Sequence, residues 1–231
     1  MFRAIIDLSH SVTENAPNWE GTPQSLQTTI IASHSTNGYF VRKVTLDEHS
    51  STHMDAPAHM GPGMWMIDEV PPERLVCSLI VLDVRDKVHT DDDYLISAAD
   101  VAAWEAAHGK IPPGAVVIAR TGWGERWPDS RTYRNADDSG TLHFPAYALE
   151  AAEFLVESRK AFGLGIDTLS VDCGGSQDYA VHRFCAMRNV YHLENVANLE
   201  NVPPGGALAV VAPAKLEGGS GAPVRIFVLV P

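Results

Sequence analysis

The stretch Glu48-His49-Ser50-Ser51-Thr52-His53-Met54-Asp55-Ala56-Pro57-Ala58-His59 carries three histidines and one aspartate at even intervals, His-x3-His-x-Asp-x3-His. All four are metal-ligand or acid–base residue types. A helix would turn Asp55 away from His49 and His53, because two residues advance about 200° around its axis. An extended chain points every second side chain to one face, so all four side chains would emerge together.

A straight strand of this length spans roughly 33 Å, too far for its side chains to converge on one ion. The chain must therefore bend, and Pro57 and the Ser50-Ser51 pair are suitable places. A single histidine is usually an ordinary surface or core residue. Three of the ten histidines at matching parity with Asp55 argue against that explanation. We expect a bent, extended loop that carries a metal site.

This stretch resembles His-x-Gly-Thr-His-x-Asp-x-Pro-x-His, the signature of the cyclase family of metal-dependent hydrolases, which includes bacterial kynurenine formamidases and isatin hydrolases. Ser51 stands where the signature has glycine, a residue that permits positive φ or close backbone approach. The resemblance extends from about Ile5 to the last expected strand. It implies an α/β fold, a β-rich domain of the cyclase-like swivelling β/β/α type.

Length and composition are those of an ordinary soluble protein. The 231 residues suit one domain over 1–231, and no internal repeat or convincing linker divides them. Hydrophobic residues make up 45% and charged residues 20%, as in globular proteins. The net charge of -12 argues against a nucleic-acid partner, and no apolar run reaches the ~18 residues of a membrane span.

The sequence favours a cytoplasmic protein. Asp7 interrupts the first apolar stretch, so no signal-peptide core is expected there. The three cysteines are odd in number and show no CxxC pairing, which favours reduced thiols over a disulfide framework.

Hydrophobic patterning predicts strands separated by two helices. One helix is expected from the Ser97 cap, with Asp100 at the capping-box position, to a stop at Gly109. Pro145 suits the first turn of a second helix over 146–161. The expected strands cover 4–8, 28–32, 40–46, 78–84, 115–119, 166–172, 207–212 and 224–230. The strand over 40–46 would deliver the chain directly into the histidine-rich stretch.

A second cluster of candidate ligands follows in Asp178–His182 and His192–Leu199. Spacing alone does not choose between His182 and His192, and Glu194 could equally cap a helix or pair on the surface. The cyclase family carries a downstream histidine and then a glutamate within a Glu-Asn-Leu-x-Asn-Leu-like stretch. His182 and Glu194 match those positions, with Val196 in place of the leucine.

The resemblance implies a role for each of these side chains. His49, His53 and Asp55 would bind metal, with Asp55 able to bridge two ions. His182 and Glu194 would hold the second ion, and His59 would transfer protons without binding metal. Imidazole and carboxylate ligands suit Zn²⁺, and also Mn²⁺ when oxygen ligands increase. One or two ions are expected.

Two tryptophans are candidates for the substrate pocket. Trp65 lies in Met64–Met66, an apolar stretch next to the site that we interpret as a mobile pocket wall, although ordinary core residues fit equally well. Trp123 follows an expected strand and could stack on a substrate, but single tryptophans are more often packing groups.

These residues predict a metal-dependent amidohydrolase for a small, aromatic amide. The substrate would resemble that of an arylformamidase, which cleaves N-formylkynurenine to kynurenine and formate. The alternative is a cyclic amide or lactone, as in isatin hydrolases. Glu194 favours the two-ion formamidase type, because the isatin branch is expected to carry glutamine and one ion. A non-catalytic metal-binding protein is a third hypothesis, but a closed structural site has no use for His59. The family further implies a homo-oligomer, a dimer or a tetramer.

Overall fold

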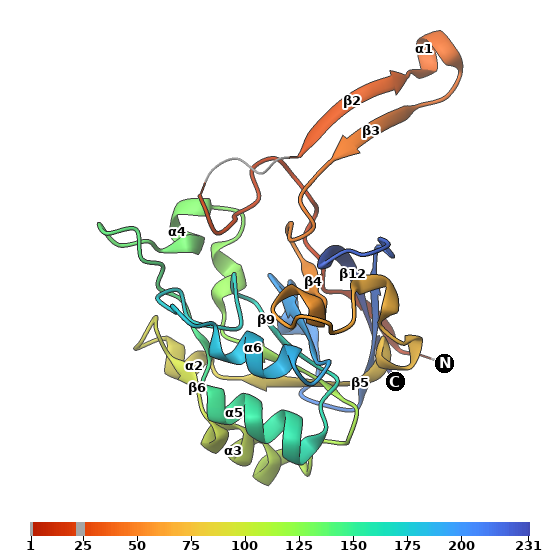
Figure 1. Cartoon of the computed structure of the whole chain (residues 1–231). Helices are drawn as coiled ribbons and strands as arrows, with labels where there is room; N and C mark the ends of the chain where they lie inside the picture. Colours follow the sequence, from red (N-terminus) through yellow and green to blue (C-terminus); the bar gives the residue numbers. More distant parts are fainter. Residues whose placement is uncertain (1, 22–25) are drawn as a thin grey trace.

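A closed, mixed β-barrel forms the centre of the protein (Figure 1). The computed structural model describes residues 2–21 and 26–231. The strands of the main sheet are β1 (Ala4–Asp7), β4 (His53–Asp55), β5 (Val76–Asp83), β7 (Val116–Arg120), β9 (Gly163–Ile166), β10 (Tyr191–Glu194), β11 (Ala207–Pro213) and β12 (Gly221–Val230). They run in the order β1-β12-β11-β5-β7-β9-β10-β4, and β4 also pairs with β12. This last pairing closes seven strands into a barrel and leaves β1 outside. The expected α/β, β-rich fold class is confirmed.

Alternating side chains separate the barrel interior from an outer layer. In β7, Val116 and Ile118 face the interior, whereas Val117 and Ala119 pack against the helices outside. β5, β7, β9 and β10 run parallel and are joined by connections over the outer face. Such strands are buried on both faces and therefore read as continuous apolar runs. The helices are α1 (His34–Asn37), α2 (Arg85–Val88), α3 (Ala98–His108), α4 (Ser130–Arg134), α5 (Leu149–Glu153) and α6 (Ala180–Ala186).

The capping box expected at Ser97 begins α3. Ser97 Oγ accepts a hydrogen bond from the Asp100 backbone N–H at 3.3 Å, and the Asp100 carboxylate accepts one from the Ser97 N–H at 2.7 Å. Gly109 follows the last helical residue with φ of 90°. Here local chemistry was sufficient to predict both ends of the helix.

Two other expected elements have different bounds. The second helix begins at Leu149, because Ala146–Tyr147 forms the short strand β8, paired with β6 (Leu95–Ile96). The helix continues as a π-helix over Phe154–Ser158. The strand expected over 166–172 is instead β9, which ends at Ile166. The side chain of the next residue, Asp167, accepts hydrogen bonds from backbone N–H groups in the turn after β7.

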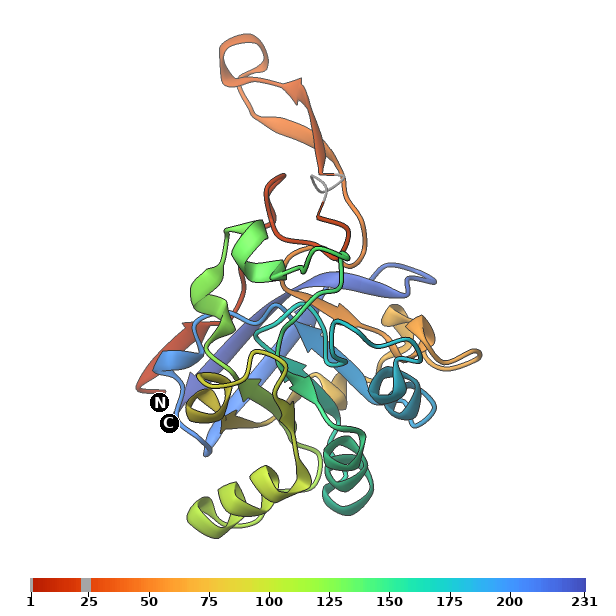
Figure 2. The same ribbon diagram turned by 90° about the vertical axis from the view of Figure 1, so that its left-hand side faces the viewer.

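An arm projects from the barrel in both views (Figures 1 and 2). It comprises residues 26–46, in which β2 (Gln27–Ala32) and β3 (Val41–Thr45) pair with each other and carry α1 at their tip. The strand patterns over 28–32 and 40–46 are thereby confirmed. Apolar side chains of the arm are exposed, with Ile30 at 64% and Tyr39 at 58%. No helix in the described part of the chain is long and apolar enough to cross a membrane.

Candidate metal centre

The chain turns sharply as it passes from the arm into β4. Ser51 lies in the left-handed region with φ of 53°, the conformation that glycine adopts most easily. Asn195 Nδ2 donates a hydrogen bond to the Ser51 carbonyl at 2.9 Å, which fixes the turn from the barrel side. A 3-10 helix at Pro57–His59 redirects the chain again. The expected bends are both present, but His53–Asp55 between them is a strand and not a loop.

Strands β4 and β10 present their polar side chains on one face. They are antiparallel, with His53 opposite Glu194 and Asp55 opposite His192. The intervening Met54 and Leu193 point into the barrel, where both are fully buried. The period of two along each strand therefore places four ligand-type side chains at the corners of one patch outside the barrel.

Carboxylates and imidazoles alternate around a small space on this patch. Nε2 of His53 lies 3.2 Å from Asp55 Oδ1 and 3.4 Å from Glu194 Oε2. Nε2 of His182, which arrives from α6, lies 3.1 Å from Asp55 Oδ2 and 3.4 Å from Glu194 Oε1. All four side chains are buried. The two segments that sequence spacing left apart thus meet at one place.

Hydrogen bonds orient both histidines toward this space. His53 Nδ1 donates to the Ser51 carbonyl at 3.0 Å, and His182 Nδ1 donates to Asp172 Oδ2 at 2.7 Å. The Nε2 atom of each ring is then the one that faces the carboxylates. Metal-binding histidines are commonly held in this way by a carbonyl or carboxylate on the opposite nitrogen.

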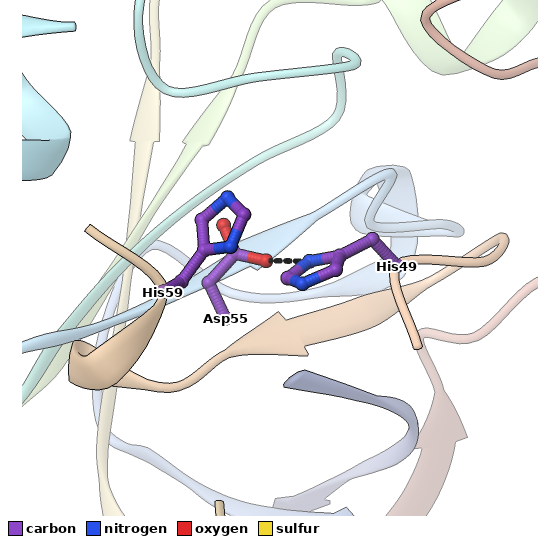
Figure 3. Close-up of side chains that lie close together, drawn as sticks. All are labelled: His49, Asp55 and His59. Atoms are coloured by element: carbon purple, nitrogen blue, oxygen red, sulfur yellow. Dashed lines mark hydrogen bonds and ion pairs between the residues drawn. The ribbon is translucent and has the colours of Figure 1, made fainter. Parts of the chain in front are cut away.

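The rings of His49 and His59 both lie beside the Asp55 carboxylate, and the carboxylate interacts with His49 (Figure 3). The Ser220 hydroxyl donates to Glu48 at 2.7 Å, so its oxygen accepts from Nε2–H of His49 at 3.0 Å. Nδ1 of His49 is then the nitrogen that faces Asp55 Oδ1, at 2.6 Å. The His59 ring centre is 4.2 Å from that of His49. His49, Asp55 and His59 thus form a second group of possible metal ligands, and all three line the cavity described below.

Electrostatics show that this centre favours positive charge. Burial opposes protonation of His53, but Asp55 and Glu194 outweigh it and raise the pKa of His53 to about 10. Burial also opposes the charged form of His182, yet its hydrogen bonds to Asp172 and Asp55 raise its pKa well above the ordinary value. A divalent cation supplies the same compensation to the two carboxylates while both rings stay neutral. The donor set therefore fits a metal ion.

For two other histidines at the centre, His59 and His192, burial disfavours the charged form. Burial lowers the pKa of His59, and it lowers the pKa of His192 to about 4. Three overlapping groups of side chains in the described chain could hold an ion, and Asp55 belongs to all of them: His49, Asp55 and His59; Asp55, His182 and His192; His53, Asp55 and Glu194.

A cavity of about 310 Å³ opens onto the centre. The six polar residues predicted from the sequence all line it: His49, His53, Asp55, His59, His182 and Glu194. The two tryptophans proposed for the pocket lie elsewhere. The guanidinium carbon of Arg74 lies over the ring of Trp65, 4.9 Å from the ring centre. Trp123 is buried, and its Nε1–H donates a hydrogen bond to the Tyr133 carbonyl at 2.7 Å.

The aromatic residues at the cavity are Trp19 and Tyr179, whose ring centres are 6.3 Å apart. The sequence analysis assigned neither residue to the site. Asp172, which orients His182, was also missed because its segment was interpreted as a strand. The even interval between His192 and Glu194 was the available signal for His192.

A histidine–carboxylate centre on a seven-stranded mixed barrel, open to a cavity, has the arrangement of a hydrolase that works with a bound metal ion. Residues 6–173 match the model of the Cyclase family, and the chain belongs to this family. The expected family is thereby confirmed, and the relatives named next confirm the expected hydrolase class.

Curated relatives and solved structures support both branches of the expected activity. The chain is 36% identical over 196 residues to an isatin hydrolase of Roseibium aggregatum, covering 81% of this chain and 74% of the relative. It is 30% identical over 224 residues to a kynurenine formamidase of Salinibacter ruber, covering 96% and 95%. The structure of isatin hydrolase A from Ralstonia solanacearum is similar with a TM-score of 0.91 and 32% identity, covering 99% of this chain and 92% of that one.

Proposed function

We propose that this protein hydrolyses the carbonyl–nitrogen bond of a small aromatic amide with one or two bound divalent ions. The carrying observation is the pair of carboxylates, Asp55 and Glu194, that brackets Nε2 of both His53 and His182 at 3.1–3.4 Å. Once a cation is bound, the two imidazoles are neutral, and together with the two buried carboxylates they supply ligands for more than one cation. Two-ion operation is expected of the formamidase type, so N-formylkynurenine is the first substrate to test.

Isatin, a cyclic amide, is the second candidate. The relative with 36% identity and the solved structure with a TM-score of 0.91 are both isatin hydrolases, which favours this ring-opening reaction. Both substrates place a carbonyl–nitrogen bond on an aromatic ring, so Trp19 and Tyr179 at the cavity wall suit either one.

A divalent ion held here would supply polarisation of the substrate carbonyl and acidification of water, whose pKa would fall toward ~7. Zn²⁺ is the first choice and Mn²⁺ the alternative, since the donors combine imidazole with carboxylate. His49, His53, Asp55, His182 and Glu194 would hold the ions.

His59 is the proposed proton carrier. Its ring adjoins that of His49 at the cavity, and its lowered pKa keeps it neutral and able to accept a proton. It would take a proton from the attacking water and deliver it to the departing nitrogen, the exchange that general acid–base catalysis requires.

We also propose a cytoplasmic homo-oligomer. A two-stranded hairpin is at best marginally stable in water, and the apolar side chains of the arm are exposed in the single chain. Residues 26–46 contain Arg42 and Lys43 but no carboxylate, in a chain of net charge -12. The acidic body of a second copy would therefore complement the arm. The free thiols of Cys77, Cys173 and Cys185 suit a reducing compartment.

The experiment is a metal analysis combined with turnover of N-formylkynurenine, isatin and a lactone. The wild-type chain should carry about one to two equivalents of divalent transition metal. His53→Ala should lose both metal and activity, whereas His89→Ala, at an exposed histidine directly after α2, should change neither. Full metal occupancy in His53→Ala would refute the ligand assignment.

A further inference from the structure

His192 occupies the fourth corner of the polar patch formed by β4 and β10. It stands directly opposite Asp55 in the strand register and shares a face with Glu194, two residues along β10. The other three corners are the proposed ligands His53, Asp55 and Glu194. The backbone therefore aims His192 toward the metal centre and away from the barrel interior.

The imidazole of His192 lies unsatisfied at this position. Its Nε2 atom is buried and has no hydrogen-bond partner, and within the described chain only His10 Nε2 shares that state among buried side-chain nitrogens and oxygens. A buried polar atom without a partner is rare in folded proteins and indicates a bound water or ion. An ion in this position would account for it.

His192 is close to two proposed ligands. Asp55, His182 and His192 each offer a ligand atom, and these atoms lie within 4.8 Å of one another. The ring centres of His182 and His192 are 4.6 Å apart. A contraction of about an ångström brings three such atoms onto one ion, since zinc–nitrogen and zinc–oxygen bonds are roughly 2.0–2.2 Å long.

We propose that His192 is a further metal ligand, which joins Asp55 and His182 at one of two ion positions. His192 does not line the cavity that opens onto the centre. It would therefore bind the ion from the protein side and leave the cavity side to the substrate. This inference rests on the proposed metal-dependent function.

The test replaces His192 with phenylalanine, which keeps a ring of similar size and removes the nitrogen ligands. Zn²⁺ binding is measured by chelator competition, and the absorption spectrum of the Co²⁺-loaded protein reports the coordination. We expect one ion to bind more weakly than in the wild type by at least ~10- to 100-fold, the cost of losing even a group that only orients a metal ligand, with a changed Co²⁺ spectrum. His10→Phe is the matched control, since it removes the other unpartnered histidine, and it should bind metal as the wild type does.

Wild-type affinity and an unchanged Co²⁺ spectrum in His192→Phe would overturn the proposal. If the variant does not fold, anomalous diffraction from a Zn²⁺-loaded wild-type crystal decides, because an ion should lie about 2.0–2.2 Å from a His192 nitrogen. An ion position that His192 does not reach would also overturn it. A wild-type chain that binds no divalent metal refutes the proposed function itself, whereas a metal-dependent hydrolase with wild-type binding in His192→Phe refutes only this inference.

Discussion

The carboxylate of Asp172 accepts a hydrogen bond from Nδ1 of His182 at 2.7 Å and holds the backbone N–H of the same residue at 2.9 Å. This double contact ties the ring of His182 to the beginning of α6 and directs its Nε2 toward Asp55. The carboxylate also favours the ring tautomer that binds metal, because it keeps the proton on Nδ1.

Asp172→Asn should therefore weaken metal binding by about 10- to 100-fold while the fold persists. Chelator competition measures the affinity, and circular dichroism monitors the fold. Asp178→Asn, six residues away in the exposed loop before α6, serves as the control. Unchanged affinity in Asp172→Asn would mean that His182 needs no such support.

Glu194→Gln should separate one-ion from two-ion operation. Glutamine keeps the shape of the side chain and loses the charge that helps to hold a second cation. We expect the loss of about one equivalent of metal and of most turnover, measured by elemental analysis and substrate assay. Glu200→Gln, at an exposed position nearby, should behave as wild type. Wild-type stoichiometry and rate in Glu194→Gln would remove Glu194 from the centre and weaken the formamidase assignment.

His59→Ala should retain metal and lose turnover by ~10²–10⁴, the usual contribution of a positioned acid–base group. The loss should be smaller for activated aryl esters than for formamides, because an aryl oxide leaves without a proton. Comparison of both substrate types with metal content makes the test. A metal-free variant would show that His59 is a ligand, and equal losses on both substrates would show that it positions the substrate instead.

Ser51 should tolerate glycine and not valine. The left-handed conformation costs a non-glycine residue ~1–2 kcal/mol, and a β-branched side chain more. In Ser51→Gly this relief is offset by the greater freedom of glycine in the unfolded chain, about 0.5–1 kcal/mol, and by the lost hydrogen bond to the Ser11 carbonyl. Thermal unfolding should show a small change for glycine and a clear fall for valine. Equal melting temperatures of the valine variant and the wild type would contradict the strained turn.

His10 should make the protein less stable in mild acid. Burial lowers its pKa to about 4, and its ring stacks on Trp127 with centres 4.1 Å apart. The unfolded chain, with an ordinary histidine pKa of about 6.5, binds the proton more readily, so stability falls as the pH drops from about 6.5 to about 4. His10→Phe keeps the stacking and removes the titration.

The free energy of unfolding of this variant, measured against pH with denaturant, should fall less than that of the wild type. The difference should grow to about 1–3 kcal/mol at pH 4. His89→Phe, at an exposed histidine outside the arm, supplies the control. Parallel pH profiles for His10→Phe and the wild type would show that His10 is not protonated on unfolding.

Local pattern predicted those parts of the centre that lie on one stretch of chain. The parity of His49, His53 and Asp55 placed them on one face, and the family motif selected His182 and Glu194. The parity of His192 and Glu194 puts both on one face of a strand, but only the pairing of β10 with β4, about 140 residues apart in sequence, brings that face to Asp55. The assignment of Trp65 and Trp123 to the pocket relied on their closeness to a motif or strand along the chain, and neither lines the cavity. Trp19 does line it, although it comes from a turn that is distant in sequence.

The three-residue strand β4 carries two proposed ligands and also closes the barrel by pairing with both β10 and β12. Few backbone hydrogen bonds hold this short strand, so an ion bound between β4, β10 and α6 would stabilise the place where the barrel closes. Ligand binding to the native state alone adds stability in proportion to the logarithm of free metal concentration. A chelator should therefore speed hydrogen–deuterium exchange first at the amides of residues 53–55 and 192–194, while the amides of β7 stay protected. The local stability of β4 and its pairing with β10 would therefore depend on the free metal concentration.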